Sequence, residues 1–464
     1  MPRKKKEDSD DDYKFINDDD DEEEDDYPFN KNDEPDNIIS VIKKNIKIRN
    51  NIINKNKNKK YTKILEKYNK DEIVYFNNLD ESEKNNIYNI ETSLNNNNLL
   101  NINTPLRFKF LNMNTSDMNK YYILTKYEQL CSMSPYSSEY FKLYSWINTI
   151  SNIPLGNYHK LPITNTDNIS NISNFLINIK KELDNKIYGH IEAKEHIIRI
   201  LSQWISYPNA KGYIIGIQGA MGIGKTKLIK DGICNVLKYP FSFISLGGIS
   251  DSSYLKGHSF TYEGSKYGKI VESLMKAKVM NPIFFFDELD KVSDTKLGEE
   301  IINTLIHITD NTQNEKFTDR YFEEIDLDIS KSIIFFSYND ESLINPILKD
   351  RMITIKVKGY NINDKIIIAQ DYLLKDIMKE YNLNYNDIIF TNDIIKLIIE
   401  LTDDEEGVRN LQRNINNIIS HINMYKYLPS KDININFPYT ITKDICEKFC
   451  KKKHTTDIKL SMYL

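Results

Sequence analysis

The sequence reads Gly219-Ala220-Met221-Gly222-Ile223-Gly224-Lys225-Thr226 between an apolar run at Tyr213–Ile217 and a helical stretch at Leu228–Leu237. This order fits the pattern G-x-x-x-x-G-K-[ST], in which glycines let backbone N–H groups turn inward and cradle phosphates at the start of a helix. Lys225 is expected to reach the β- and γ-phosphates of ATP, and Thr226 to hold Mg²⁺. A purely structural glycine turn is the alternative, but the strand-turn-helix context favours a nucleotide-binding P-loop.

Two adjacent acids follow a second apolar run of strand length. The run Ile283–Phe286 leads directly into Asp287 and Glu288. Asp287 is predicted to hold Mg²⁺ and its water shell, and Glu288 to orient the attacking water and accept its proton. Such a pair is often only a solvated strand end. Together with the P-loop, however, Glu288 predicts hydrolysis of ATP rather than binding alone.

Two polar residues further along extend this predicted site. Asn339 follows the apolar run Ile333–Ser337, and its amide is suited to position the lytic water near the γ-phosphate, although an ordinary turn residue is the alternative. Arg351 follows a short predicted helix. It could be an arginine finger offered to a neighbouring subunit's nucleotide, or an exposed arginine paired with Asp350.

The fold class is predicted by apolar runs of strand length that alternate with helical stretches. These runs are Tyr213–Ile217, Phe241–Ser245, Ile283–Phe286 and Ile333–Ser337. Between residues 184 and 360 this alternation indicates an α/β domain with a parallel sheet covered by helices on both faces. Residues 361–452 return to helical spacing, which predicts an α-helical subdomain with one apolar face formed by Ile394, Leu397, Ile398 and Leu401. Residues 453–464 form the remaining C-terminal end.

The N-terminal part divides by composition. Residues 7–37 hold seventeen Asp and Glu against Lys14 and Lys31, so we expect residues 1–37 to be a disordered acidic tail. Residues 38–163 begin with an Asn, Ile and Lys bias and continue with helical spacing, which predicts a small helical domain. The Asn, Thr and Ser content at 164–183 then predicts a connector.

Composition bounds the location of the protein. The chain is 40% hydrophobic, enough for a packed core, and it has neither a run of about 18 apolar residues nor an apolar N-terminal signal. We therefore expect a soluble intracellular protein without a membrane partner. The cluster Arg3–Lys6 could be a nuclear import signal or a solvated basic end, and a cytoplasmic location is the expectation.

The four cysteines are too few and too scattered for a secreted disulfide framework. Cys446, Cys450 and His454 have helical spacing and invite a zinc interpretation. Three ligands without a fourth nearby make a poor structural site, so ordinary helix packing is favoured.

Several stretches resemble the AAA+ ATPases, and within them the Lon proteases, over roughly Leu130–Lys452. The matching stretches are Ile187–His190 with Lys194, Ser245–Asp251 with Lys256–His258 and Thr261–Tyr262, Asn281–Lys291, and Glu406–Arg413. The resemblance implies that Tyr188 and Gly189 belong to the adenine pocket and that Asn339 is sensor 1.

The same resemblance implies that Arg351 is the arginine finger acting in trans and that Arg409 is sensor 2 on the lid. Tyr262 falls where Lon-like motors carry the aromatic residue that grips a polypeptide in the central pore. Its neighbour Glu263 replaces the usual apolar residue, and Tyr267 stands in the following turn.

The resemblance also sets two limits. In Lon a Ser-Lys peptidase domain follows the lid, whereas this sequence ends shortly after Cys450. Intrinsic peptidase activity is therefore not expected. The long N-terminal substrate-recognition domain of Lon is shortened or replaced by residues 38–128.

The sequence as a whole predicts a ring-forming ATP hydrolase, most simply a hexamer, that unfolds or remodels polypeptides and could serve a separate peptidase. A nucleic-acid motor or loader is the alternative, since the part of the chain beyond the acidic tail is mildly basic. A scaffold that binds ATP without hydrolysing it is disfavoured by Glu288, Asn339, Arg351 and Arg409.

Overall fold

The computed structural model describes residues 61–65, 68, 70–97, 105–249, 251–428 and 437–450. The predicted acidic tail, the cluster Arg3–Lys6, the biased stretch up to residue 60 and the C-terminal end at 453–464 lie outside the described residues. The chain divides into two compact units, residues 1–103 and 104–464. Within the described ranges, no helix combines the length and the apolar character needed to cross a lipid bilayer.

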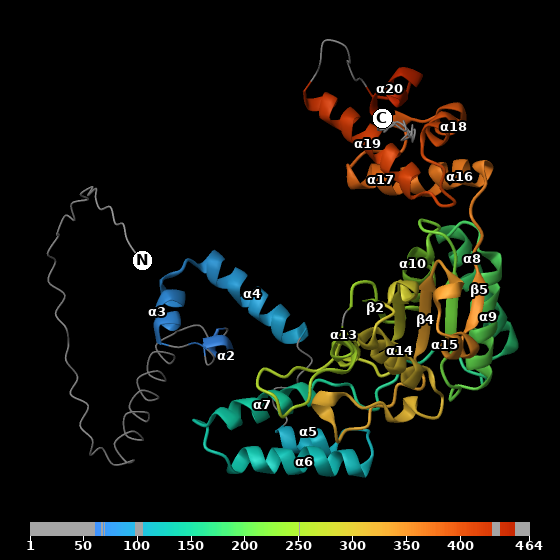
Figure 1. Cartoon of the computed structure of the whole chain (residues 1–464). Helices are drawn as coiled ribbons and strands as arrows, with labels where there is room; N and C mark the ends of the chain where they lie inside the picture. Colours follow the sequence, from blue (N-terminus) through green and yellow to red (C-terminus); the bar gives the residue numbers. More distant parts are fainter. Residues whose placement is uncertain are drawn as a thin grey trace, which may run out of the picture. The chain divides into compact units, whose positions relative to one another are not determined.

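The first unit is a small helical assembly, drawn in blue in Figure 1. Its helices are α2 (Thr62–Leu65), α3 (Lys70–Asn78) and α4 (Glu81–Asn97). Its apolar core contains Tyr61, Ile64, Leu65, Ile73 and Phe76.

The second unit is built on a five-stranded parallel sheet with the order β2-β3-β4-β1-β5. The strands are β1 (Ile214–Gln218), β2 (Phe241–Ser245), β3 (Ile283–Asp287), β4 (Ile333–Tyr338) and β5 (Ile353–Lys356). The α/β prediction is confirmed, and the first four strands lie within one residue of the predicted runs. Because β3, β4 and β1 are neighbours, the ends of the three strands that carry predicted site residues meet at one edge.

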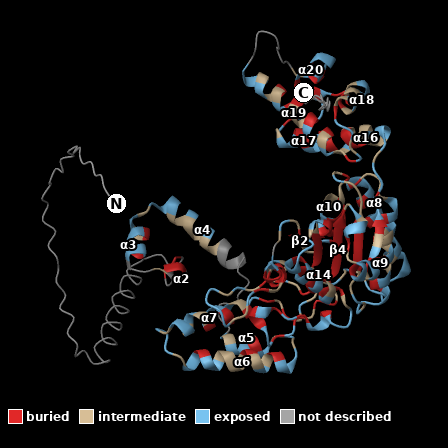
Figure 2. Cartoon of the chain, viewed as in Figure 1, coloured by how far each residue is buried: buried red, intermediate tan, exposed pale blue. Residues whose placement is uncertain are grey.

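Helices cover both faces of the sheet, and Figure 2 shows its strands mostly buried. One face packs against α8 (Ile169–Lys186), α9 (Ile191–Ser206) and the helix after the P-loop, which runs from α10 (Lys225–Lys227) through residues 228–234 into α11 (Asn235–Leu237). The other face packs against α13 (Lys269–Ala277) and α14 (Lys296–Thr309). Two shorter helices, α12 (Ser253–Lys256) and α15 (Pro346–Arg351), lie near the ends of strands.

Three helices predicted to form part of a separate domain share the core of the sheet. They are α5 (Leu106–Leu111), α6 (Asp117–Ser132) and α7 (Ser138–Ile150). Trp146 of α7 is 1% exposed, and its indole N–H donates to the carbonyl of Tyr321 over 3.1 Å. The structure thus divides the predicted helical domain at residue 103, since helical spacing reveals a buried face but not what covers it.

The predicted connector at 164–183 is largely helical. Helix α8 begins at Ile169 and buries Ile179 and Leu183 against α9 and the sheet. Phe175 packs against the same core. The polar composition indicated a loop, but the apolar residues recur at helical spacing, and this pattern is the one the structure follows.

The C-terminal part of the second unit is the predicted α-helical subdomain, the lid. It contains α16 (Ile362–Ile368), which continues through residues 369–373 into α17 (Leu374–Glu380), then α18 (Asn392–Leu401), α19 (Arg409–Tyr427) and α20 (Lys443–Phe449). Two short strands, β6 (Ile388–Ile389) and β7 (Tyr439–Thr440), pair in parallel. The lid has a hydrophobic core of its own.

Cys446 and Cys450 belong to the lid core. Burial raises the pKa of the Cys446 thiol to about 11 and that of Cys450 to about 12, so both thiols are protonated at neutral pH. His454 lies outside the described residues. Among the residues that are described, no group of three or more His, Cys, Asp or Glu side chains could hold a metal ion.

Candidate active site

A cavity of ≈ 530 Å³ at the ends of the strands collects most of the predicted site residues. Its walls come from the P-loop, the ends of β3 and β4, the segment before α9, and the lid. The predicted residues that line it are Tyr188, Met221, Gly222, Ile223, Gly224, Lys225, Thr226, Asp287, Glu288, Asn339 and Arg409. Motifs more than two hundred residues apart in the sequence, such as those of Tyr188 and Arg409, therefore meet around one cavity.

The P-loop turns sharply between β1 and α10. Gly222 has φ 77° and Gly224 has φ 87°, a left-handed conformation that glycine adopts without a steric penalty. At Gly219 a Cβ would lie 2.8 Å from the carbonyl oxygen of Val357, so a larger residue would displace the strand connection. The three glycines of the motif thus serve the turn as well as the approach of a ligand.

Lys225 lies between the P-loop and the end of β4. Its ammonium donates to the side-chain oxygen of Asn339 over 2.6 Å and to the carbonyl of Ala220 over 3.3 Å. Burial lowers the pKa of Lys225, an effect opposed by the nearby carboxylates of Asp287 and Asp290. The cation is thereby held at the centre of the cavity wall.

The two acids at the end of β3 point in different directions. Asp287 accepts a hydrogen bond from the hydroxyl of Ser337 on the adjacent strand. Glu288 has φ 60°, and its side chain lies beside Gly247 instead. A Cβ on Gly247 would lie 2.1 Å from the Oε2 of Glu288. Gly247 therefore leaves room for the Glu288 carboxylate at the cavity.

The structure adds Asp290, which we did not predict as a site residue. Asp290 is 6% exposed and lines the cavity. Its Oδ2 accepts the N–H groups of Asn339 over 3.2 Å and Asp340 over 3.4 Å, while Oδ1 has no hydrogen-bond partner among the described residues. The one sequence signal was its place two residues after Glu288.

The lid contacts the P-loop directly. The N–H of Val408 donates to the carbonyl of Gly222 over 3.1 Å. A Cβ on Gly407 would lie 2.4 Å from the carbonyl carbon of Gly222. A Cβ on Gly222 would lie 2.9 Å from the Cβ of Arg409. The absence of side chains at both glycines thus brings Arg409, the first residue of α19, to the cavity.

The predicted adenine-pocket residues lie between α8 and α9. Tyr188 lines the cavity and donates its hydroxyl to Asp364 of the lid over 2.8 Å. Gly189 has φ 68° and lines a neighbouring pocket instead. Tyr360, a further cavity residue missed by sequence reasoning, donates its hydroxyl to the carbonyl of Ile223 over 2.9 Å.

Arg351 lies away from this cavity. Its guanidinium donates to the carbonyl of Ile306 over 2.6 Å and pairs with Asp310 over 3.0 Å. The ion-pair partner in the described part of the chain is thus Asp310, at the end of α14, rather than Asp350.

Tyr262 lies on the loop at residues 257–268, called the Tyr262 loop below. Its side chain is 67% exposed, whereas Tyr267 packs against Tyr321 with ring centroids 6.3 Å apart. Lys142 of α7 donates to the carbonyl of Thr261 over 3.1 Å. The structure therefore separates one exposed aromatic residue from one that packs.

The chain is similar to one family model and to several Lon proteases. Residues 215–360 match the family described as ATPase family associated with various cellular activities (AAA). A Lon protease homolog of Acanthamoeba polyphaga mimivirus is 37% identical over 330 residues, which are 70% of this chain and 32% of that protein. The Lon protease of Cytophaga hutchinsonii is 32% identical over 317 residues, 68% of this chain and 37% of that protein.

A peroxisomal Lon protease homolog 2 of Caenorhabditis briggsae is 29% identical over 346 residues, 73% of this chain and 43% of that protein. The chain thus spans less than half the length of each of these relatives. The chain belongs to the AAA+ ATPases, with a motor module similar to the ATPase part of Lon proteases.

Proposed function

We propose that this chain is a ring-forming motor that couples ATP hydrolysis to the pulling of unfolded polypeptide. The observation that supports it is the single cavity in which the P-loop, the acids after β3, Asn339 and Arg409 meet. The exposed aromatic side chain of Tyr262, on a loop of the same unit, supplies the second half of the proposal.

The residues around the cavity fit a nucleotide with Mg²⁺. Lys225 binds the β- and γ-phosphates, and Thr226 with Asp287 holds the metal ion. Oδ1 of the buried Asp290 has no hydrogen-bond partner within the described ranges. This supports the fit, because a buried carboxylate oxygen without a donor favours a nearby cation or its water shell. A Mg²⁺ ion held by Thr226 and Asp287 would neutralise the negative charge that develops on the phosphate oxygens.

Hydrolysis is assigned to residues at the strand ends and on the lid. Glu288 orients the attacking water and accepts its proton, and Asn339 holds that water near the γ-phosphate. Arg409 contacts the γ-phosphate from the lid and transmits its loss. The hydrogen bond from the N–H of Val408 to the carbonyl of Gly222 supports this coupling, because it joins the lid to the P-loop.

Arg351 is assigned to the neighbouring subunit's nucleotide. It does not line the cavity of its own chain, which supports a role in trans and therefore a closed ring, most simply a hexamer. In the single chain, the ion pair with Asp310 fixes the position of the Arg351 guanidinium.

We further propose that the 464-residue chain does not cleave polypeptide by itself and that a peptidase acts as a separate partner. Its support is that the family match, residues 215–360, is to an ATPase family. The test is incubation of the purified chain with ATP and casein, followed by electrophoresis. Cleavage by a preparation free of other proteases contradicts it.

The rate of ATP hydrolysis with different polymers tests the whole assignment. It should rise on addition of an unfolded protein and stay at its basal value with single-stranded DNA. Stimulation by DNA alone would instead support the nucleic-acid motor, and no hydrolysis under any condition would overturn the motor.

A further inference from the structure

The base of the Tyr262 loop is unusually tight. The two ends of the loop, Gly257 and Gly268, pass so closely that a Cβ on Gly268 would lie 2.6 Å from the nitrogen of Gly257. Tyr262 is exposed at the other end of the loop. The direction in which this side chain points therefore depends on how the base is held.

A fully buried carboxylate lies at this base. Asp319 is 0% exposed, and its Oδ2 accepts the N–H of Gly268 over 2.8 Å. Its Oδ1 accepts the N–H of Tyr321 over 2.8 Å. A Cβ on Gly257 would lie 2.8 Å from the same Oδ1, so both ends of the loop touch this one side chain.

Burying this carboxylate opposes its ionisation. Burial raises the pKa of Asp319 to about 7, against the effect of the two N–H donors and of the charges on Arg320 and Lys256. A buried acid is costly unless its hydrogen bonds are made, and here one of the two backbone donors belongs to the loop. The side chain is thus specifically suited to hold the loop.

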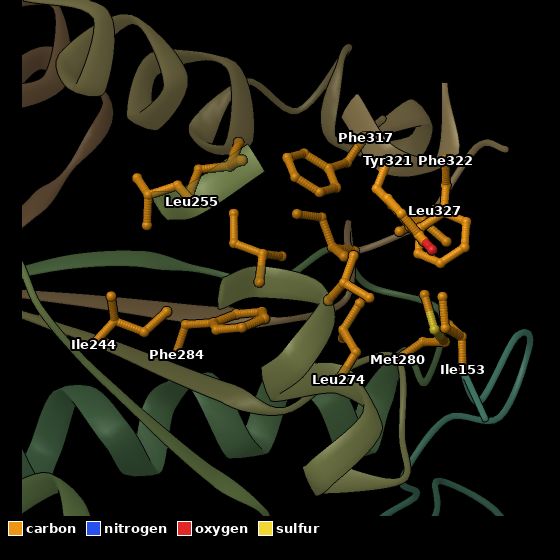
Figure 3. Close-up of a cluster of buried hydrophobic side chains, with 14 of the residues drawn as sticks. Ile153, Ile244, Leu255, Leu274, Met280, Phe284, Phe317, Tyr321, Phe322 and Leu327 are labelled. Carbon is orange, nitrogen blue, oxygen red and sulfur yellow. The ribbon is translucent and has the colours of Figure 1, made fainter. Parts of the chain in front are cut away.

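The segment that carries Asp319 is itself fixed in the core. Figure 3 shows Phe317, Tyr321, Phe322 and Leu327 gathered with Leu255 and Leu274 around one apolar cluster. The ring of Tyr321 also lies 5.6 Å from that of Phe260 on the loop. Asp319 therefore joins the Tyr262 loop to a rigid part of the unit.

We propose that Asp319 is a positioning residue for polypeptide binding, which fixes the base of the Tyr262 loop so that the exposed tyrosine keeps one orientation. This inference rests on the proposed function of Tyr262. Asp319 is fully buried and does not line the cavity at the P-loop, so its effect is transmitted through the backbone of Gly268.

Hydrogen exchange measures the anchor without reference to function. In the wild-type chain the amide of Gly268 should exchange as slowly as amides of β3, although it lies at the base of an exposed loop. In Asp319→Asn, which keeps the size but loses one acceptor, exchange across 257–268 should accelerate while β3 is unchanged. Rapid exchange of Gly268 in the wild type overturns the proposal, even if the variant does not fold.

Substrate response measures the consequence for function. The concentration of unfolded protein that gives half-maximal ATPase stimulation should rise about tenfold in Asp319→Asn, since one hydrogen bond at the base of the loop is lost. The basal ATPase rate should remain close to that of the wild type. Asp328→Asn is the matched control, because Asp328 bonds Ser330 and Tyr158 and does not contact the loop.

The two readouts separate the inference from the proposed function. One outcome is that amides of the loop exchange faster in Asp319→Asn while unfolded protein does not stimulate even the wild-type ATPase. This result supports the role of Asp319 at the base of the loop and contradicts the proposed polypeptide motor. If unfolded protein stimulates both chains equally and exchange in the loop is unchanged, the motor stands and the positioning role of Asp319 is overturned.

Discussion

The ammonium of Lys225 lies 2.6 Å from the side-chain oxygen of Asn339, which joins the P-loop to the end of β4. A phosphate bound at Lys225 is therefore within reach of Asn339 as well. The same contact holds the Lys225 ammonium at the cavity that both residues line.

Lys225→Ala should weaken ATP binding by a factor on the order of 100 or more, because a buried charged contact contributes about 2–5 kcal/mol. Equilibrium titration with a fluorescent ATP analogue measures the loss. Lys230→Ala is the control, since Lys230 is exposed on the same continuous helix. Equal affinity of both variants for ATP would contradict the assignment.

Glu288→Gln should retain ATP binding and lose hydrolysis by about 10²–10⁴-fold, the usual contribution of a general base. The amide has nearly the size of the carboxylate, so the contact with Gly247 is kept. Phosphate release and nucleotide binding are measured on the same preparation. Unchanged turnover would remove Glu288 from the mechanism.

Gly407→Ala should lower the ATPase rate about tenfold, since the added Cβ would meet the P-loop backbone at 2.4 Å and displacing the lid costs about 1–3 kcal/mol. Steady-state hydrolysis shows the effect, and an unchanged melting temperature shows that the fold is retained. A wild-type rate would mean that the contact between lid and P-loop is not needed for turnover.

Arg351→Ala and Lys225→Ala subunits should each be inactive alone and should regain part of the ATPase activity when mixed. In a mixed ring, an intact P-loop meets an intact arginine at some of the interfaces. Light scattering verifies that rings have formed before the rate is measured. Mixed rings without recovered activity would place the action of Arg351 within its own chain.

Tyr262→Ala should lower the ratio of stimulated to basal ATPase rate toward one, because the exposed aromatic side chain no longer holds polypeptide. ATPase assays with increasing unfolded protein provide the measurement. Tyr207→Ala is the matched control, since Tyr207 is 61% exposed and lies outside the loop. Full stimulation of Tyr262→Ala would show that the tyrosine does not grip the substrate.

The sequence predicted the sheet and the P-loop well because the decisive information is local. A glycine turn between a strand and a helix, or two acids after an apolar run, can be recognised without knowing their neighbours. Four strands were placed within one residue for this reason. The fifth, β5, was not predicted, since only one of its residues is fully buried and the apolar run is short.

The missed features depend on contacts between distant segments. Asp290 is recognised as a site residue only from the structure, in which its carboxylate accepts a hydrogen bond from the N–H of Asn339. The fit of Gly407 against Gly222 needs the lid to be placed on the P-loop. The position of α7 in the core of the sheet likewise follows from Trp146 meeting Tyr321, which no periodicity within α7 could indicate.

The shared core of α7 and the sheet affects how the motor can be isolated. A fragment cut to the family match at 215–360 would lose the side chains that cover Phe322 and its neighbours, among them Trp146, and would expose them to water. Such a fragment would be prone to aggregate and would understate the catalytic capacity of the protein. A fragment that begins at residue 105 retains α5, α6 and α7, which pack against this part of the core.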